Sequence, residues 1–199
     1  SNKMEVYIGS AWMEVSVSTS NLDGGSRGIM AGGYPQSDNI DYFNIESASN
    51  AIDFGNLTDG RWGMASGASR TRGLFAGGDS PSDVNIIDFI TFASTGNATD
   101  FGDVGPDQWR YAAGLSTQTR FVMAGGATTP AGQSNMIQSV EIASQGNTVD
   151  SGGNLSSARQ ASSSCCSPTR GVIAGGYTPS SVNIIEFITM STLGDGQDF

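Results

Sequence analysis

Short apolar runs alternate with polar and glycine-rich turns along the whole chain, and no segment has the apolar spacing of an amphipathic helix. One order of elements recurs four times. A stretch of small residues is followed by an apolar run that starts with arginine and ends in Gly-Gly, then by a run rich in isoleucine and phenylalanine, and then by a short element with an aspartate. Each unit therefore predicts four short strands.

The arginine-to-glycine runs align the four copies without ambiguity. They occupy residues 27–33, 72–78, 120–126 and 170–176. Their alanines, at positions 31, 76, 124 and 174, are 45, 48 and 50 residues apart. Four strands in such a period are typical of a β-propeller blade rather than of a helical solenoid.

We therefore predict an all-β fold, a four-bladed β-propeller with four antiparallel strands per blade, closed within one chain. The alternative is a larger ring completed by further copies in a longer chain or by copies from neighbouring chains. Residues 16–199 would form the propeller, with repeats at about 16–55, 56–103, 104–153 and 154–199. The small residues of the first two strands would line the inner ring, and the Gly-Gly pair would permit positive φ at the exit from the second strand. The first strand of the first copy is expected near residues 16–20.

Residues 1–15 precede the repeats and predict a leader hairpin, with strands at residues 4–8 and 11–15. An isolated hairpin is marginally stable in water, so we expect it to pack either against its own propeller or against a partner chain, and the second arrangement would favour a homo-oligomer. Because the chain starts with Ser1, we also expect it to be a piece of a longer protein.

Charge and composition exclude several functions. Nine basic and nineteen acidic residues give a net charge of −10, which disfavours binding to nucleic acid. No apolar run is long enough for a membrane helix, so we predict no membrane insertion. The two cysteines, Cys165 and Cys166, are adjacent and provide no disulfide framework.

The sequence offers little catalytic chemistry. Residues 24–28 match the G-x-S-x-G motif of serine hydrolases, but the chain has no histidine to complete a triad. The same lack removes the usual zinc and copper ligand sets. Asp100, Asp103 and Asp107 could bind calcium, but their spacing is not that of an EF-hand and favours a solvated acidic turn. We predict no enzyme activity, no cofactor and no metal site.

An arginine and an aspartate recur at fixed positions in the repeats. The simplest interpretation is one structural ion pair per blade, and a functional ring of arginines is the alternative. The expected pairs are Arg27 with Asp53, Arg72 with Asp100, Arg120 with Asp150, and Arg170 with Asp198.

The loops after Gly-Gly vary in length and residue type between copies, and we expect them to lie on one face together with the loops between repeats. Variable loops on a repeated scaffold are where recognition is usually placed. The aromatic candidates for binding a ligand or partner are Tyr34, Trp62, Trp109 and Tyr177, with packing as the alternative role.

The Gly-Gly doublet resembles the kelch repeat, although Trp62 and Trp109 have no counterpart in the fourth copy, where Arg159 and Gln160 stand. A closer resemblance is to kelch-like arrays in virion structural proteins of tailed phages, especially cyanophages. Residues 71–78, 85–91 and 94–104 carry it, and residues 169–176 and 183–189 repeat it. Residues 2–12 resemble a hairpin common in phage fibre proteins.

The resemblance implies a non-enzymatic virion component, such as a fibre or a head or tail decoration. Its location would be the extracellular particle, and its partners other virion proteins and a host surface glycan. A kelch-type carbohydrate-binding or carbohydrate-active protein outside phages is the alternative function, and a decoration protein without a ligand is a third.

Overall fold

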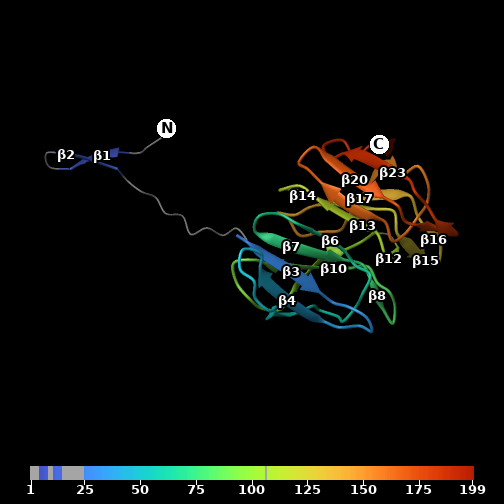
Figure 1. Cartoon of the computed structure of the whole chain (residues 1–199), viewed down its shortest axis with the longest axis horizontal. Coiled ribbons are helices and arrows are strands. Elements are labelled where there is room, and N and C mark those ends of the chain that lie inside the picture. Colours follow the sequence, from blue (N-terminus) through green and yellow to red (C-terminus); the bar gives the residue numbers. More distant parts are fainter. Residues whose placement is uncertain (1–4, 9–10, 15–24, 106) are drawn as a thin grey trace.

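The computed structural model describes residues 5–8, 11–14, 25–105 and 107–199, and these residues form strands and turns without a helix. The predicted all-β class is therefore confirmed for the described part of the chain (Figure 1). No helix in that part could cross a membrane. The predicted leader hairpin is also present, as β1 (Glu5–Ile8) paired antiparallel with β2 (Ala11–Glu14).

Each repeat folds into an antiparallel meander in which strands adjacent in the repeat are adjacent in the sheet. Sheet 1 contains β3 (Arg27–Ala31), β4 (Asn39–Asn44) and β5 (Ile52–Asn56). Sheet 2 contains β6 (Ala65–Ala68), β7 (Arg72–Ala76), β10 (Ile86–Thr91) and β11 (Thr99–Asp103). Sheet 3 contains β13 (Ala113–Ser116), β14 (Arg120–Ala124), β17 (Met136–Glu141) and β18 (Val149–Asn154). Sheet 4 contains β19 (Ser163–Cys166), β20 (Arg170–Ala174), β23 (Ile185–Thr189) and β24 (Gln197–Asp198).

Sheets 2 to 4 have the four strands predicted for a repeat, in the predicted order. Sheet 1 has three described strands, because the first strand expected near residues 16–20 lies outside the described residues. The repeats are also in a common register: Ala31, Ala76, Ala124 and Ala174 each lie opposite an isoleucine of the next strand, respectively Ile40, Ile87, Ile137 and Ile185.

Small additional strands occur in the loops between the second and third strand of repeats 2 to 4. They are β8 (Asp79–Ser80) with β9 (Ser82–Asp83), β15 (Ala127–Thr129) with β16 (Gly132–Gln133), and β21 (Tyr177–Thr178) with β22 (Ser180–Ser181). A further strand, β12 (Gln108–Arg110), pairs with β15. Sequence patterning did not predict these strands because they are short and lack apolar alternation.

The Gly-Gly pairs have the predicted positive φ. In repeat 2, Gly77 has φ of 65° and Gly78 of 117°, and the other three pairs are similar. A side chain is disfavoured there, so glycine lets the chain leave the second strand and enter the loop. This turn is fixed by a hydrogen bond from Gly77 N to Ile86 O of 2.9 Å.

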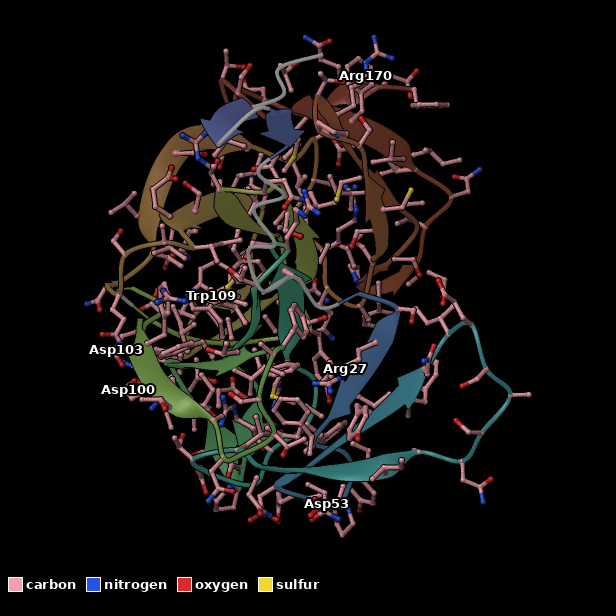
Figure 2. All side chains as sticks on the ribbon, turned by 90° about the vertical axis from the view of Figure 1, so that its left-hand side faces the viewer. Arg27, Asp53, Asp100, Asp103, Trp109 and Arg170 are labelled. Atoms are coloured by element: carbon pink, nitrogen blue, oxygen red, sulfur yellow. The ribbon has the colours of Figure 1, made fainter. Side chains whose placement is uncertain are left out.

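The sheets pack against one another in chain order. One apolar cluster lies between sheets 1 and 2 around Ile40, Phe54 and Phe75, and two further clusters join sheet 2 to 3 and sheet 3 to 4. Figure 2 shows the sheets following one another round the molecule in sequence colours, from blue and cyan through green and olive to red-brown. The core is therefore divided among the junctions between successive sheets.

The first strands of successive repeats approach most closely. A Cβ on Gly114 of β13 would overlap the backbone of Ser66 in β6. Ser116 Oγ accepts a hydrogen bond from Ala68 N of 3.0 Å, and Ser164 Oγ donates to Gly114 O at 2.8 Å. Small residues are needed in these strands because neighbouring backbones leave no room for larger side chains.

Among the described residues, sheets 1 and 4 do not meet to close the row. In the described part of the chain they share no hydrogen bond and no apolar cluster. Their outward side chains are exposed instead, including Met30 and Ile45 of the first repeat and Ile185 and Phe199 of the fourth. The described residues therefore do not confirm the predicted four-bladed ring closed within one chain.

Candidate functional site

Three aromatic side chains form a continuous row on the loops that follow the second and fourth strands. The ring of Tyr34 lies 5.3 Å from that of Trp62, and Trp62 lies 5.4 Å from Tyr111, both in edge-to-face geometry. Tyr34 is 79% exposed, whereas Trp62 and Tyr111 are half-buried. We call Tyr34, Trp62 and Tyr111 the aromatic row.

Backbone hydrogen bonds between repeats hold the row in place. Gly33 N donates to Arg61 O at 3.0 Å, which places Tyr34 beside Trp62. Trp62 exchanges backbone hydrogen bonds with Asp79, and Tyr111 N donates to Gly63 O at 2.7 Å. The row therefore spans the first three repeats and depends on their packing.

A charged group borders the row. Arg110 Nη1 lies 3.0 Å from Asp79 Oδ2 and 2.9 Å from Asp83 Oδ1, so one guanidinium joins two carboxylates. The Thr129 hydroxyl donates to the other oxygen of Asp83. Arg110 also lies 5.5 Å from the ring centre of Tyr111, within the range of a cation–π contact.

Burial raises the pKa of the Tyr111 hydroxyl above its ordinary value of 10.0. Arg110 opposes this effect, and the carboxylates of Asp79 and Asp83 add to it. Tyr111 is therefore a neutral hydrogen-bonding group at ordinary pH. Aromatic rings beside a neutral hydroxyl, an arginine and carboxylates provide the stacking surfaces and polar groups that suit a sugar.

The four predicted binding residues have different environments. Tyr34 and Trp62 are together in the aromatic row. Tyr177 is 45% exposed, and its backbone pairs with Gln160 on the fourth repeat. Trp109 is only 1% exposed and packs in the cluster between sheets 2 and 3, so it is a core residue that cannot contact a ligand at the surface.

Tyr111 was missed in the sequence because its equivalents are Gly63 and Ala161, so no aromatic pattern marks the position. All three residues have positive φ, of 70°, 54° and 55° for Gly63, Tyr111 and Ala161. Positive φ is uncommon for tyrosine and persists only where its surroundings hold it. This backbone turn projects the ring of Tyr111 toward Trp62.

Three of the four repeated arginines join neighbouring sheets through backbone carbonyls. Arg72 Nη1 donates to Ile142 O at 2.9 Å and to Ala143 O at 3.1 Å. Arg27 donates equivalently to Phe92 O, and Arg120 to the carbonyls of Met190 and Ser191. The outer arginine, Arg170, is exposed and lies over the ring of Phe187.

The ion pairs expected between these arginines and the repeated aspartates are not among the ion pairs of the described residues. Figure 2 shows Arg27 near the middle of the view and Asp53 at its lower margin. Asp100 and Asp150 each accept a hydrogen bond from the glycine two residues later, at 3.2 and 2.9 Å. Asp53 and Asp198 are exposed.

The recurring partner of the arginine is an aromatic pair. Arg27 lies over Tyr42, which meets Phe54 edge-on, and Arg72 lies over Phe89, which meets Phe101. Repeat 4 has the same arrangement with Phe187 and Phe199. In repeat 3 both rings are replaced by serine, and Arg120 pairs instead with Glu141 at 3.0 Å. The recurring spacing of arginine and aspartate in the sequence indicated that the arginine has a common kind of partner in the repeats. It did not show that this partner is an aromatic ring.

Two buried ion pairs lie at junctions where no pair was predicted. Arg61 Nη2 lies 3.0 Å from Asp88 Oδ2 at the junction of sheets 1 and 2, with both side chains fully buried, and Arg159 pairs with Glu186 in the same way at the junction of sheets 3 and 4. At the junction between them, Trp109 and Gln138 occupy these positions and both are buried. The sequence carries a sign of these pairs, because the two repeat positions change together. Both are charged in repeats 2 and 4, and both are uncharged in repeat 3.

The described residues contain no group of three or more side chains that could hold a metal ion, so they give no support to a calcium site at Asp100, Asp103 and Asp107. Figure 2 shows Asp100 and Asp103 at the edge of the molecule. A scan against protein-family models finds no match, and a search of curated proteins finds none either. The resemblance to kelch and phage proteins therefore remains a prediction.

Proposed function

We propose that this chain is a non-enzymatic binding module of a phage virion, built from kelch-like β-propeller blades, and that the aromatic row binds a glycan of the host surface. The aromatic row is the observation that supports this proposal most directly. Its three rings lie beside Arg110 and the carboxylates of Asp79 and Asp83. The meander order of the sheets supports the assignment of blades.

The geometry favours binding over catalysis. Arg110 holds Asp79 and Asp83 together, and Asp83 is 2% exposed and also bonded to Thr129. Both carboxylates are therefore engaged in contacts with other side chains of the protein. The row, by contrast, offers rings in contact with solvent, and aromatic faces are common in sugar sites.

A glycan array probed with the full chain tests ligand binding, followed by titration calorimetry on the best glycan. Trp62→Ala should weaken binding at least tenfold, because it removes the middle ring of the row. Tyr177→Ala is the matched control, since this exposed tyrosine lies outside the row, and it should bind as the parent does. Equal weakening by both variants would contradict the site.

Two further measurements separate this function from its alternatives. Mass spectrometry of purified phage particles should detect the chain if it is a virion component. Glycoside-hydrolysis assays on the bound glycan should show no turnover, whereas turnover that is lost in Asp79→Asn would favour the carbohydrate-active alternative. A chain found in particles that binds no glycan would be a decoration protein.

A further inference from the structure

The junctions between successive sheets are built from one repeated set of contacts. The earlier sheet contributes an arginine that donates hydrogen bonds to carbonyls of the later sheet, and an isoleucine that packs in the apolar cluster between the two sheets. At the second junction these are Arg72, bonded to Ile142 O and Ala143 O, and Ile87, which is fully buried. The later sheet contributes an apolar side chain from its second strand, here Met123, which is 2% exposed.

The same groups recur at the other two junctions. At the first junction, Arg27 donates to Phe92 O and Ile40 packs in one cluster with Phe75. At the third junction, Arg120 donates to Met190 O and Ile137 packs in one cluster with Ile173. Ile40 and Ile137 are fully buried, as is Ile173. Three junctions with one chemistry define what each face of a repeat requires from its neighbour.

Sheet 4 presents the earlier half of this junction without a later sheet. Ile185 lies at the position of Ile40, Ile87 and Ile137 but is 45% exposed. Phe199, which corresponds to the buried Phe54 and Phe101, is 72% exposed. Arg170 reaches no carbonyl among the hydrogen bonds found in the described residues and is exposed.

Sheet 1 presents the later half. Met30 occupies the position of Phe75, Met123 and Ile173 and is 63% exposed. Ile45 occupies the position of Phe92, Ile142 and Met190, whose carbonyls accept the arginines, and it is 68% exposed. Each open face of the chain therefore carries the groups that the other open face lacks.

We propose that the outer face of sheet 4 binds the outer face of sheet 1 of a second copy of this chain, through the contacts that join successive sheets within one copy. Arg170 would donate to the carbonyls of Ile45 and Glu46 of the second copy, and Met30 would cover Ile185 and Phe199. The two faces are different, so the contact is head-to-tail and continues an existing interface. It needs neither the leader nor a ligand, and it is independent of the proposed glycan site.

Charge gives the association a recognisable salt dependence. Each copy carries a net charge of −10, so two copies repel each other over distances that salt screens. The proposed contact itself is mainly apolar with one arginine, and it loses little from screening. Association should therefore strengthen between 20 and about 300 mM salt.

Sedimentation velocity and light scattering of the full chain, from about 1 to 200 µM, test the proposal. The chain should self-associate, whereas Met30→Glu and Ile185→Glu should each be monomeric over that range. Arg170→Ala should weaken association about tenfold or more, since it removes hydrogen bonds from a charged group. Val149→Glu is the control: Val149 is 65% exposed on sheet 3, away from both end faces, and this variant should associate as the parent does.

Mixing the two monomeric variants is the decisive measurement. Met30→Glu retains an intact sheet 4 face and Ile185→Glu an intact sheet 1 face, so an equimolar mixture should form a heterodimer through one remaining junction. Circular dichroism establishes that both variants are folded. A parent chain that stays monomeric at 200 µM would overturn the proposal, as would association that survives both substitutions or a mixture that forms no heterodimer.

Discussion

The buried ion pair between Arg61 and Asp88 gives the sharpest test of how the repeats are held together. Both side chains are fully buried at the junction of sheets 1 and 2. Asp88 also accepts hydrogen bonds from Thr58 N at 3.0 Å and Thr58 Oγ1 at 2.7 Å, while Arg61 Nε donates to Gly77 O at 2.9 Å. Each charge therefore depends on the other for its compensation inside the protein.

Asp88→Asn keeps the shape of the side chain but leaves the guanidinium of Arg61 buried without a counter-charge. Breaking one side of a buried pair costs about 3–5 kcal/mol, so the free energy of unfolding should fall by that amount. With a urea dependence of about 2–3 kcal/mol per molar, the unfolding midpoint would fall by roughly 1–2.5 M. Glu141→Gln breaks the exposed pair with Arg120 and should cost at most about 1 kcal/mol.

The next junction of the same chain shows which uncharged residues can replace both members of the ion pair. Trp109 and Gln138 occupy the equivalent positions at the next junction, so Arg61→Trp combined with Asp88→Gln should lose less stability than the sum of the two single changes. Urea unfolding followed by circular dichroism and tryptophan fluorescence measures all variants. If Asp88→Asn shifted the midpoint no more than Glu141→Gln, the pair would not contribute to stability as we argue.

Other contacts give further expectations. Arg72→Ala removes two hydrogen bonds from a charged group between sheets 2 and 3, so the free energy of unfolding should fall by about 1.5–3 kcal/mol. Arg170→Ala should change the unfolding midpoint of the monomer little. Equal losses of stability in the two variants would contradict this expectation. Because burial raises the pKa of Tyr111 in the folded state, its contribution to stability is complete below pH 10 and is lost as pH rises through the folded pKa. The difference in ultraviolet absorbance between the parent and Tyr111→Phe should therefore titrate above pH 10, and a titration below it would refute this environment. Gly114→Val should prevent close packing of β6 and β13 and lower the melting temperature more than Gly194→Val, whose added Cβ has open space around it; neither glycine is among those with positive φ, so the comparison isolates the effect of packing.

The sequence alone determined the repeat and the strand order within it. The positions of Gly-Gly, the isoleucine run and the aspartate element are local properties, because strand alternation and positive φ depend on nearby residues. The hairpin of β1 and β2 and the turns at Gly77 and Gly78 are present for the same reason. Local patterning also placed Tyr34 and Trp62 on connecting loops.

Tertiary packing decided which residues meet across repeats. The repeated arginines were expected to find a carboxylate in their own repeat, but Arg72 lies over Phe89 and donates to carbonyls about 70 residues further along the chain. Trp62 and Trp109 were both candidates for binding, but they occupy different repeat positions: Trp109 stands at the buried position of Arg61, whereas Trp62 is part of the aromatic row. The sheets also stack in a row, so burial depends on whether a neighbouring repeat covers a side chain. For the same reason, identical positions such as Ile40 and Ile185 are fully buried in one sheet and 45% exposed in another.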